Sequence, residues 1–196
     1  MNAIQIVGDD QPVQPHIFWG EMAACEHLVQ IYQEDGAFLD ALEGFAAGGL
    51  ATGEAVVVIA TAEHLAALEK RLQNHGHCLA TAGANDQYIA LDAKKSLSQF
   101  VVDGWPIESL FEEFVVSLLA RARGNGRRVR AFGEMVAVLW AQGHNGATIR
   151  LEHLWHEVCA REAFSLFCAY PRSGFTQDAE VSIKEICAAH SRVIAC

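Results

Sequence analysis

The sequence contains no apolar run approaching the roughly 20 residues that a membrane-spanning helix needs. Its first ten residues, Met1–Asp10, have neither the basic nor the apolar region of a secretory signal peptide. These absences predict a cytoplasmic protein that does not enter the membrane. Because 52% of the 196 residues are hydrophobic and 19% are charged, the chain can bury a sizeable core. We expect an N-terminal extension over residues 1–25 and a single domain over 26–196.

Basic residues are few for a chain of this length. There are 14 Lys and Arg against 24 Asp and Glu, which gives a formal net charge of −10 at pH 7. A surface with this balance repels a phosphate backbone. We therefore predict no direct binding to nucleic acid.

The six cysteines form no Cys-x-x-Cys pair. A chain with this much core does not need a disulfide framework, so we expect reduced thiols. The groupings closest to a metal site are Cys25–His27 and His75–Cys78, and neither has a matching second half. The sequence therefore predicts no structural metal and no cofactor.

No segment has the sequence of a phosphate-binding loop. Gly48–Ala55 has the two-glycine spacing, but Glu54 stands where the motif requires lysine. This segment also lies between a predicted helix and a predicted strand, whereas a phosphate loop leads from a strand into a helix. The turn in the correct place, Tyr32–Gly36, is acidic and would repel phosphate. ATP binding is therefore not expected.

Strands and helices are predicted to alternate along the chain. β-branched and apolar runs predict strands at His27–Tyr32, Ala55–Ala60, Gln87–Asp92, a short segment ending at Gly133, and Phe164–Tyr170. Apolar residues at helical spacing predict helices from Glu34 to Gly48, from Thr61 to near Gly76, and over Ser109–Arg123, Glu134–Gly143, Thr148–Arg161 and Asp178–His190. This alternation is typical of an α/β domain with a mostly parallel central sheet flanked by helices in three layers. We interpret Ala80–Asp86 and Ser96–Pro106 as loop-like segments suited to a lid.

Glu134 stands at a predicted strand-to-helix corner, where parallel sheets place their ligands. Its neighbours Phe132, Met135 and Trp140 are apolar, so burying its carboxylate requires a compensating cation, donor or proton. The alternative is that Glu134 caps its own helix or pairs with Arg130.

Other polar groups lie near predicted strand ends, with tryptophans in the following helices: Tyr32, Asp92, Tyr170, Trp140 and Trp155. A few polar groups among aromatic residues describe a pocket for a small organic ligand more than a catalytic centre. We predict a largely apolar pocket with Glu134 as its polar anchor, completed by Tyr32, Trp155, Tyr170 and, if the closing helix folds back across the sheet, His190. The alternative is that these are ordinary core aromatic residues with satisfied polar tips.

Several segments resemble one known family, the MEDS domain, a methanogen/methylotroph DcmR-type sensory domain. The resemblance extends from about Glu26 to His190, and its most specific parts are Phe132-Gly133-Glu134 and Cys168-Ala169-Tyr170-Pro171. It is also carried by His27–Tyr32, Phe38–Leu42, Gly49-Leu50, Ala55–Thr61, Leu151–Trp155 and Ile186–Ser191.

The resemblance implies a RecA/KaiC-like (P-loop NTPase-like) fold that has lost its nucleotide motifs and recognises hydrocarbon-derived small molecules. Family members are often joined to histidine kinase, anti-sigma-type kinase or DNA-binding modules. This sequence shows no such module, so we expect its signal to pass through a partner, such as a histidine kinase or a transcriptional regulator, or through self-association. We hypothesise a homodimer supported by the termini and by the aromatic arm Ile17–Trp19.

We interpret the protein as a non-catalytic sensory domain. The alternative is a protein–protein interaction scaffold on a degenerate ATPase fold that binds no ligand. An open pocket would favour the sensor, whereas a crevice filled by Trp140, Trp155 and Tyr170 would favour the scaffold.

The missing phosphate loop generates the first testable prediction. Calorimetric titration with ATP and magnesium should show no binding at micromolar concentration, because the lysine is absent and the turn after Tyr32 is acidic. Micromolar affinity for ATP would contradict this interpretation.

Overall fold

The computed structural model describes Trp19 and residues 22–23, 25–124, 126–175, 179–188 and 190–194. Its centre is a six-stranded sheet in the order β3-β2-β6-β7-β1-β8, in which every neighbouring pair is parallel. The strands are β1 (His27–Tyr32), β2 (Ala55–Ala60), β3 (Tyr88–Asp92), β6 (Val129–Gly133), β7 (Ser165–Pro171) and β8 (Arg192–Ile194). The predicted parallel α/β architecture is confirmed.

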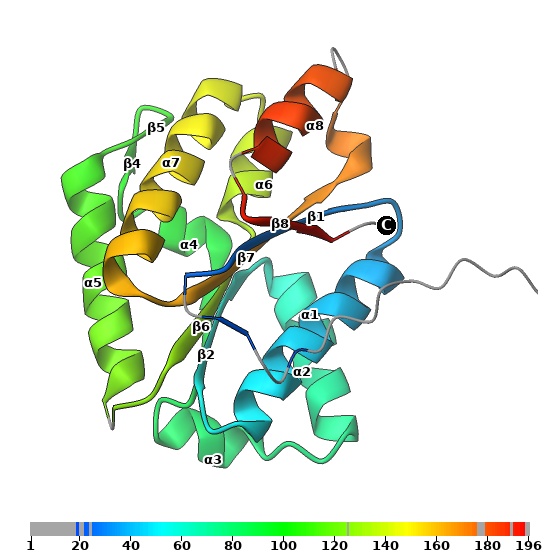
Figure 1. Ribbon diagram of the computed structural model, residues 1–196, viewed down its shortest axis with the longest axis vertical. Coiled ribbons are helices and arrows are strands. Elements are labelled where there is room, and N and C mark those ends of the chain that lie inside the picture. The colour runs from blue at the N-terminus through cyan, green and yellow to red at the C-terminus, as the bar shows by residue number, and fades with distance from the viewer. Residues whose placement is uncertain are drawn as a thin grey trace, which may run out of the picture.

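Helices cover both faces of the sheet (Figure 1). One face carries α1 (Asp35–Ala51), α2 (Ala62–Asn74) and α3 (Leu79–Ala84). The other carries α4 (Ala93–Leu97), α5 (Glu108–Arg123), α6 (Met135–Ala141), α7 (Asn145–Glu162) and α8 (Ala179–Ala188). No helix among the described residues has the length and apolarity to cross a membrane.

The β-branched run of β2 shows why the sheet is covered twice. Side chains alternate along a strand, so Val56 and Val58 pack under α1 and α2 while Val57 and Ile59 pack under the opposite helices. All four are at most 1% exposed. The carboxyl ends of the strands lie at one edge of the sheet, which positions the corners described below.

Three segments differ from the sequence-based prediction. Residues 80–86 are largely helical in α3, and 96–106 contain the end of α4 and a hairpin of β4 (Val101–Val102) and β5 (Trp105–Pro106). The amide of Lys95 donates to Asp92 Oδ1 at 2.8 Å, so the acid at the end of β3 starts α4 instead of a loop. The closing helix ends at Ala188, and the chain then forms β8, whose three residues pair with β1.

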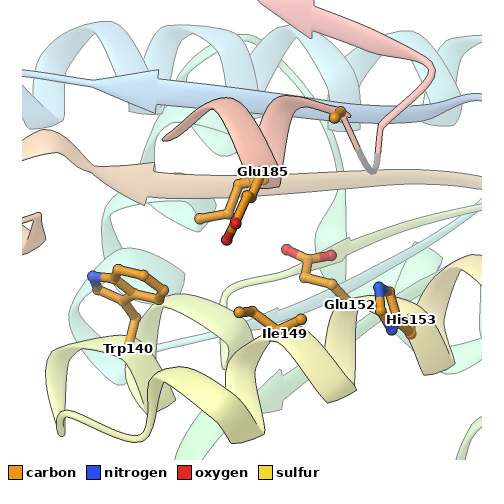
Figure 2. Close-up of a pocket in the computed structure, with 7 residues that line it drawn as sticks. Trp140, Ile149, Glu152, His153 and Glu185 are labelled. Carbon is orange, nitrogen blue, oxygen red and sulfur yellow. The ribbon is translucent and has the colours of Figure 1, made fainter. Parts of the chain in front are cut away.

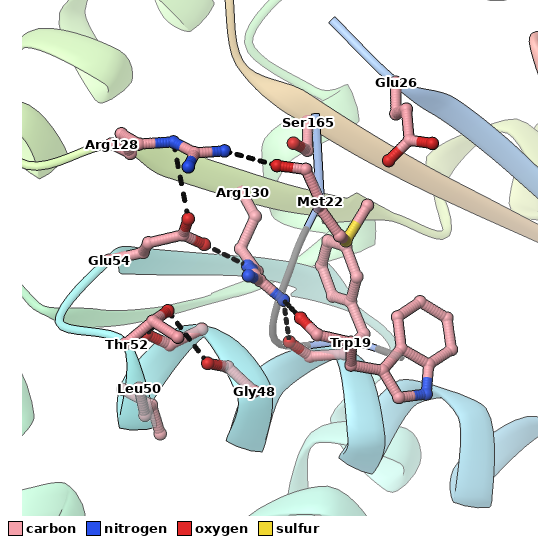
Figure 3. Close-up of polar contacts among 12 residues, drawn as sticks. Trp19, Met22, Glu26, Gly48, Leu50, Thr52, Glu54, Arg128, Arg130 and Ser165 are labelled. Carbon is pink, nitrogen blue, oxygen red and sulfur yellow. Dashed lines mark hydrogen bonds and ion pairs between the residues drawn. The ribbon is translucent and has the colours of Figure 1, made fainter. Parts of the chain in front are cut away.

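Arg130 and Glu54 form a buried ion pair between β6 and the turn before β2 (Figure 3). Arg130 is 0% exposed, and its Nη1 donates to the carbonyls of Phe45 at 3.0 Å and Trp19 at 2.8 Å. Its side chain passes so close to α1 that a Cβ on Gly49 would lie 2.7 Å from Arg130 Cδ. Glu54 thus balances a buried guanidinium at the amino-terminal edge of the sheet.

The predicted aromatic arm is described only in part. Ile17 and Phe18 lie outside the described residues. Trp19 packs on its own chain, with its ring centroid 5.7 Å from that of Phe45 and 6.0 Å from that of Phe167. The homodimer therefore stays a prediction, since this tryptophan already has an intramolecular partner.

The buried ion pair predicts a large stability effect at Glu54. Glu54→Gln keeps the shape but leaves Arg130 charged and uncompensated, so urea unfolding should show a loss of about 3–5 kcal/mol. The matched control is Glu112→Gln, which removes an exposed pair with Arg161 and should cost less than about 1 kcal/mol. Equal effects of the two substitutions would contradict a stabilising role for the buried pair.

Candidate functional site

Glu134 follows β6 and occupies the predicted strand-to-helix corner. Its carboxylate accepts hydrogen bonds from the Thr61 amide and from His64 Nδ1, both at 2.8 Å. This contact raises the pKa of His64, chiefly through the hydrogen bond with Glu134. Glu134 makes no side-chain cap on α6, and Arg130 pairs with Glu54, so neither alternative role of Glu134 is observed.

A shallow cavity of about 410 Å³ opens at this corner. We call it the Glu134 pocket; its lining includes Tyr32, Thr61, His64, Lys94 and Glu134. The Tyr32 ring stacks on Phe38 at a centroid distance of 4.7 Å and is 4% exposed. Because both carboxylate oxygens of Glu134 already have protein donors, the corner is largely a clamp between β6 and the start of α2.

A second cavity, of about 570 Å³, lies between α6, α7 and α8 (Figure 2). We call it the α8 pocket; it is lined by Trp140, Ile149, Glu152, His153, Glu185, Ile186 and Ala188. Trp140 and Ile149 come from α6 and α7, and Glu185 lies opposite them on α8. The Trp140 indole is held by a 2.9 Å hydrogen bond from Nε1 to the Gly174 carbonyl. The pocket therefore combines apolar side chains with polar groups from both α7 and α8.

Behind Glu152 lies a group of buried polar side chains, here called the buried cluster: His27, Glu152, Cys168 and His190. They come from β1, α7, β7 and the turn between α8 and β8. His27 Nε2 lies 3.5 Å from Cys168 Sγ and 3.7 Å from Glu152 Oε2, and His190 Nε2 lies 3.5 Å from the same oxygen. The Tyr170 hydroxyl donates to Glu152 Oε1.

Burial changes the protonation of this cluster. Removal from water lowers the pKa of His27 to about 2, with His190 and His156 adding to the effect, so the imidazole is neutral. The same cause raises the pKa of Glu152 and, strongly, that of the Cys168 thiol. Burial therefore disfavours a single ionised side chain in the cluster, unless an opposite charge accompanies it.

A family model describes most of this chain. The match is to the MEthanogen/methylotroph, DcmR Sensory domain, MEDS, over residues 26–191. The chain belongs to the MEDS family. The sequence-based resemblance is thereby confirmed, and a sensory role fits a family of sensory domains.

The remaining comparisons bear on the fold. No curated protein matches the MEDS chain in sequence. A protein of solved structure from Pyrococcus horikoshii OT3 is similar, with 11% identity, a TM-score of 0.58, and coverage of 91% of this chain and 85% of the other. At this identity the likeness shows the α/β fold alone.

The five residues predicted for one pocket lie in three places in this MEDS domain. Tyr32 and Glu134 line the Glu134 pocket. Tyr170 and His190 meet at Glu152, on the opposite face of the sheet. Trp155 lies elsewhere in the core, edge-on to Phe111 with ring centroids 5.0 Å apart. Tyr32 and Tyr170 lie on opposite faces of the sheet because of the register between β1 and β7. Tyr170 pairs with Ile31 and shares its face, and Tyr32, the next residue along β1, points to the other face.

Sequence reasoning missed Glu152, His27 and Cys168 as a group. One signal was available for Glu152, because Thr148, Leu151, Trp155 and Cys159 form the core-facing stripe of its helix and Glu152 falls within it. The neighbouring His153 is exposed, as the amphipathic pattern predicts. A carboxylate on the apolar stripe indicates a buried polar partner, although the pattern does not identify it.

The corner generates a prediction about pH. His64 should titrate above the usual 6.5, and Glu134→Gln should bring its pKa down, as followed by the imidazole proton signals in NMR. The pair's stabilising contribution is full below about pH 6.5 and is lost as pH rises through the folded-state pKa.

The control substitution is Glu63→Gln. Glu63 contributes least among the groups that affect His64, so its change should move the pKa far less. An unchanged His64 titration in Glu134→Gln would exclude the clamp.

Proposed function

We propose that this MEDS domain is a non-catalytic sensory module that binds a small, largely apolar organic molecule in the α8 pocket. The main support is the pocket itself, which has a volume of about 570 Å³ and has Trp140, Ile149, Ile186 and Ala188 in its walls. Ligand sites are typically cavities of about 300–1,000 Å³ with mainly apolar walls and a few polar groups. Glu152, His153 and Glu185 supply those polar groups.

The aromatic residues that would favour a ligand-free scaffold do not all fill this space. Trp140 forms a wall, whereas Trp155 and Tyr170 are 1% and 0% exposed within the core. Of these three aromatic residues only Trp140 borders the cavity, and none of them fills it, which supports the sensory alternative.

The relay of the signal is proposed to run through α8. This helix supplies Glu185, Ile186 and Ala188 to the pocket and precedes β8, which, among the described residues, pairs with the sheet through three residues of β1. A ligand that packs against α8 changes the contacts of an edge element that costs little to move. The output would pass to a second copy of the chain, a histidine kinase or a transcriptional regulator.

We also propose that the fold is a RecA/KaiC-like one without nucleotide chemistry. Support comes from the parallel sheet between two helical layers and from the corner after β1, which stands where a phosphate loop would. That corner carries Glu34 and Asp35, and no side chain caps α1. Acidic side chains at this corner repel a phosphate group. This is consistent with a RecA/KaiC-like fold whose ligand is no longer a nucleotide.

One observation favours the scaffold alternative. Exposed apolar side chains follow each other along the hairpin and the start of α5, with Val102 50%, Trp105 49%, Ile107 37% and Leu110 38% exposed. Such a patch marks protein contacts in many proteins. Under this alternative Trp105→Glu would abolish partner capture, and the α8 pocket would hold no ligand.

The sensory proposal predicts that filling the pocket displaces its ligand. Native mass spectrometry of protein purified from its own host should detect a bound small molecule, and Ile149→Trp should reduce its occupancy at least about tenfold because the larger side chain takes the ligand's space. Ile149 is 38% exposed, so the change should leave the fold intact.

The matched control is Val116→Trp on α5, at a residue 43% exposed and away from the pocket, which should leave occupancy unchanged. Full retention of the small molecule by Ile149→Trp, or its absence from the unaltered protein, would contradict the proposal.

A further inference from the structure

The buried cluster presents four potential ligand atoms from four separate elements. His27, Glu152, Cys168 and His190 are 2%, 3%, 0% and 9% exposed, and their ligand atoms all lie within 4.8 Å of one another. Two imidazoles, a thiol and a carboxyl are the side chains that bind zinc and related transition metals. Among the residues described by the structure, no other group of three or more meets the same criterion.

Four of the six separations between these atoms are close to those of a tetrahedral centre, and the other two are at most 4.8 Å. Zinc bonds of ordinary length place neighbouring ligand atoms about 3.3–3.7 Å apart. Around Glu152 Oε2 the separations are 3.7 Å to His27 Nε2, 3.5 Å to His190 Nε2 and 3.8 Å to Cys168 Sγ. His27 Nε2 and Cys168 Sγ are 3.5 Å apart. An approach of His190 by about 1 Å toward His27 and Cys168 would place the four atoms around one ion.

His190 provides an independent reason for a cation. Its Nδ1 lies 2.6 Å from the Ile186 carbonyl, which can only accept, so Nδ1 carries a proton, and in the neutral ring Nε2 has a lone pair. Nε2 is buried without a hydrogen-bond partner and faces the Glu152 carboxylate. Two acceptors that face each other away from water require a proton or a metal ion between them.

Charge favours a divalent ion at this position. Cys168 and Glu152, once deprotonated, contribute two negative charges, which neutralise one M²⁺ ion in an otherwise apolar interior. The thiolate and the two imidazoles favour zinc over calcium or magnesium. Outer contacts orient the ligands, because Tyr170 donates to the other oxygen of Glu152 and the Ile186 carbonyl fixes the His190 ring.

We propose that His27, Glu152, Cys168 and His190 form a tetrahedral site for Zn²⁺ at the inner side of the α8 pocket. On binding, the Cys168 thiol and, where it is protonated, the Glu152 carboxyl release their protons to solvent, and no oxidation is involved. The ion ties the segment after α8 to β1, β7 and α7. This site goes beyond the proposed function. It shares Glu152 with the α8 pocket, but the apolar walls proposed to hold the organic ligand do not depend on the ion.

The test uses the full-length chain, stripped with a chelator and titrated with Co²⁺ as a spectroscopic substitute for Zn²⁺. We expect one Co²⁺ per chain, with the visible bands of tetrahedral cobalt, a thiolate-to-cobalt charge-transfer band, and loss of both when Zn²⁺ is added. Cys168→Ser and His190→Gln should each weaken binding by about 100-fold or more, since removing even an outer contact costs about 10–100-fold. Cys168→Ser should also remove the charge-transfer band.

The control addresses His75–Cys78, a metal-like grouping in the sequence that lies outside the buried cluster. A triple variant, His75→Gln with His77→Gln and Cys78→Ser, removes the histidines and the thiol between α2 and α3 and should leave Co²⁺ binding unchanged. Loss of binding in the triple variant, or its retention in Cys168→Ser and His190→Gln, would overturn the proposal.

A measurement on the unaltered protein covers the case in which a substitution prevents folding. X-ray absorption of the zinc-loaded chain should show one sulfur at about 2.3 Å and three nitrogen or oxygen atoms at about 2.0–2.2 Å. A shell without sulfur, or no stoichiometric zinc after loading, would exclude the site. A negative result here leaves the native mass spectrometry test of the organic ligand untouched, so the two proposals fail separately.

Discussion

The carboxylate of Glu152 on the core-facing side of α7 is the constraint on which the candidate site depends. A carboxyl buried among apolar groups is costly unless donors, protons or a cation compensate it, and here burial raises its pKa. Tyr170 donates to one oxygen, and His27 and His190 face the other. This requirement holds α7, two neighbouring strands and the segment after α8 in one arrangement, and the open space next to it is the α8 pocket.

Buried carboxylates at the two ends of the strands both hold elements of the fold together. At the amino-terminal edge, Glu54 neutralises Arg130, which also donates to the carbonyls of Trp19 and Phe45. At the carboxyl edge, Glu134 joins the start of α2 to β6 through Thr61 and His64. Both sets fix elements in place, so the two buried carboxylates that are easiest to notice in the sequence are largely structural.

Most of the sheet could be predicted from the sequence, because local pattern and tertiary burial agree there. The run Ala55–Ala60 forms β2 as predicted, since a strand covered on both faces must be apolar throughout. β8 and the hairpin were missed because they are two or three residues long and form through pairing with other segments. α4 was missed because Asp92 was interpreted as the end of a strand, although it also caps the helix.

The candidate site was less predictable, for two physical reasons. Tyr32 and Tyr170 both lie near strand ends, but alternation along the strands and the register between β1 and β7 send them to opposite faces. The buried cluster combines residues from four segments spread between His27 and His190. No short sequence motif therefore contains its members. Local sequence patterns predict most of the fold. The cluster, in contrast, can be recognised only when the order of the strands in the sheet is known.

The central claim is that the space between α6, α7 and α8 is occupied by a small organic molecule in the working protein. Its most direct test is a crystal structure of protein purified from its own host, with the pocket examined for difference density. We predict continuous density of a small, mostly apolar molecule packed between Trp140, Ile149 and Ile186. A pocket that contains only water, or one closed by α8 against α7, would contradict the account.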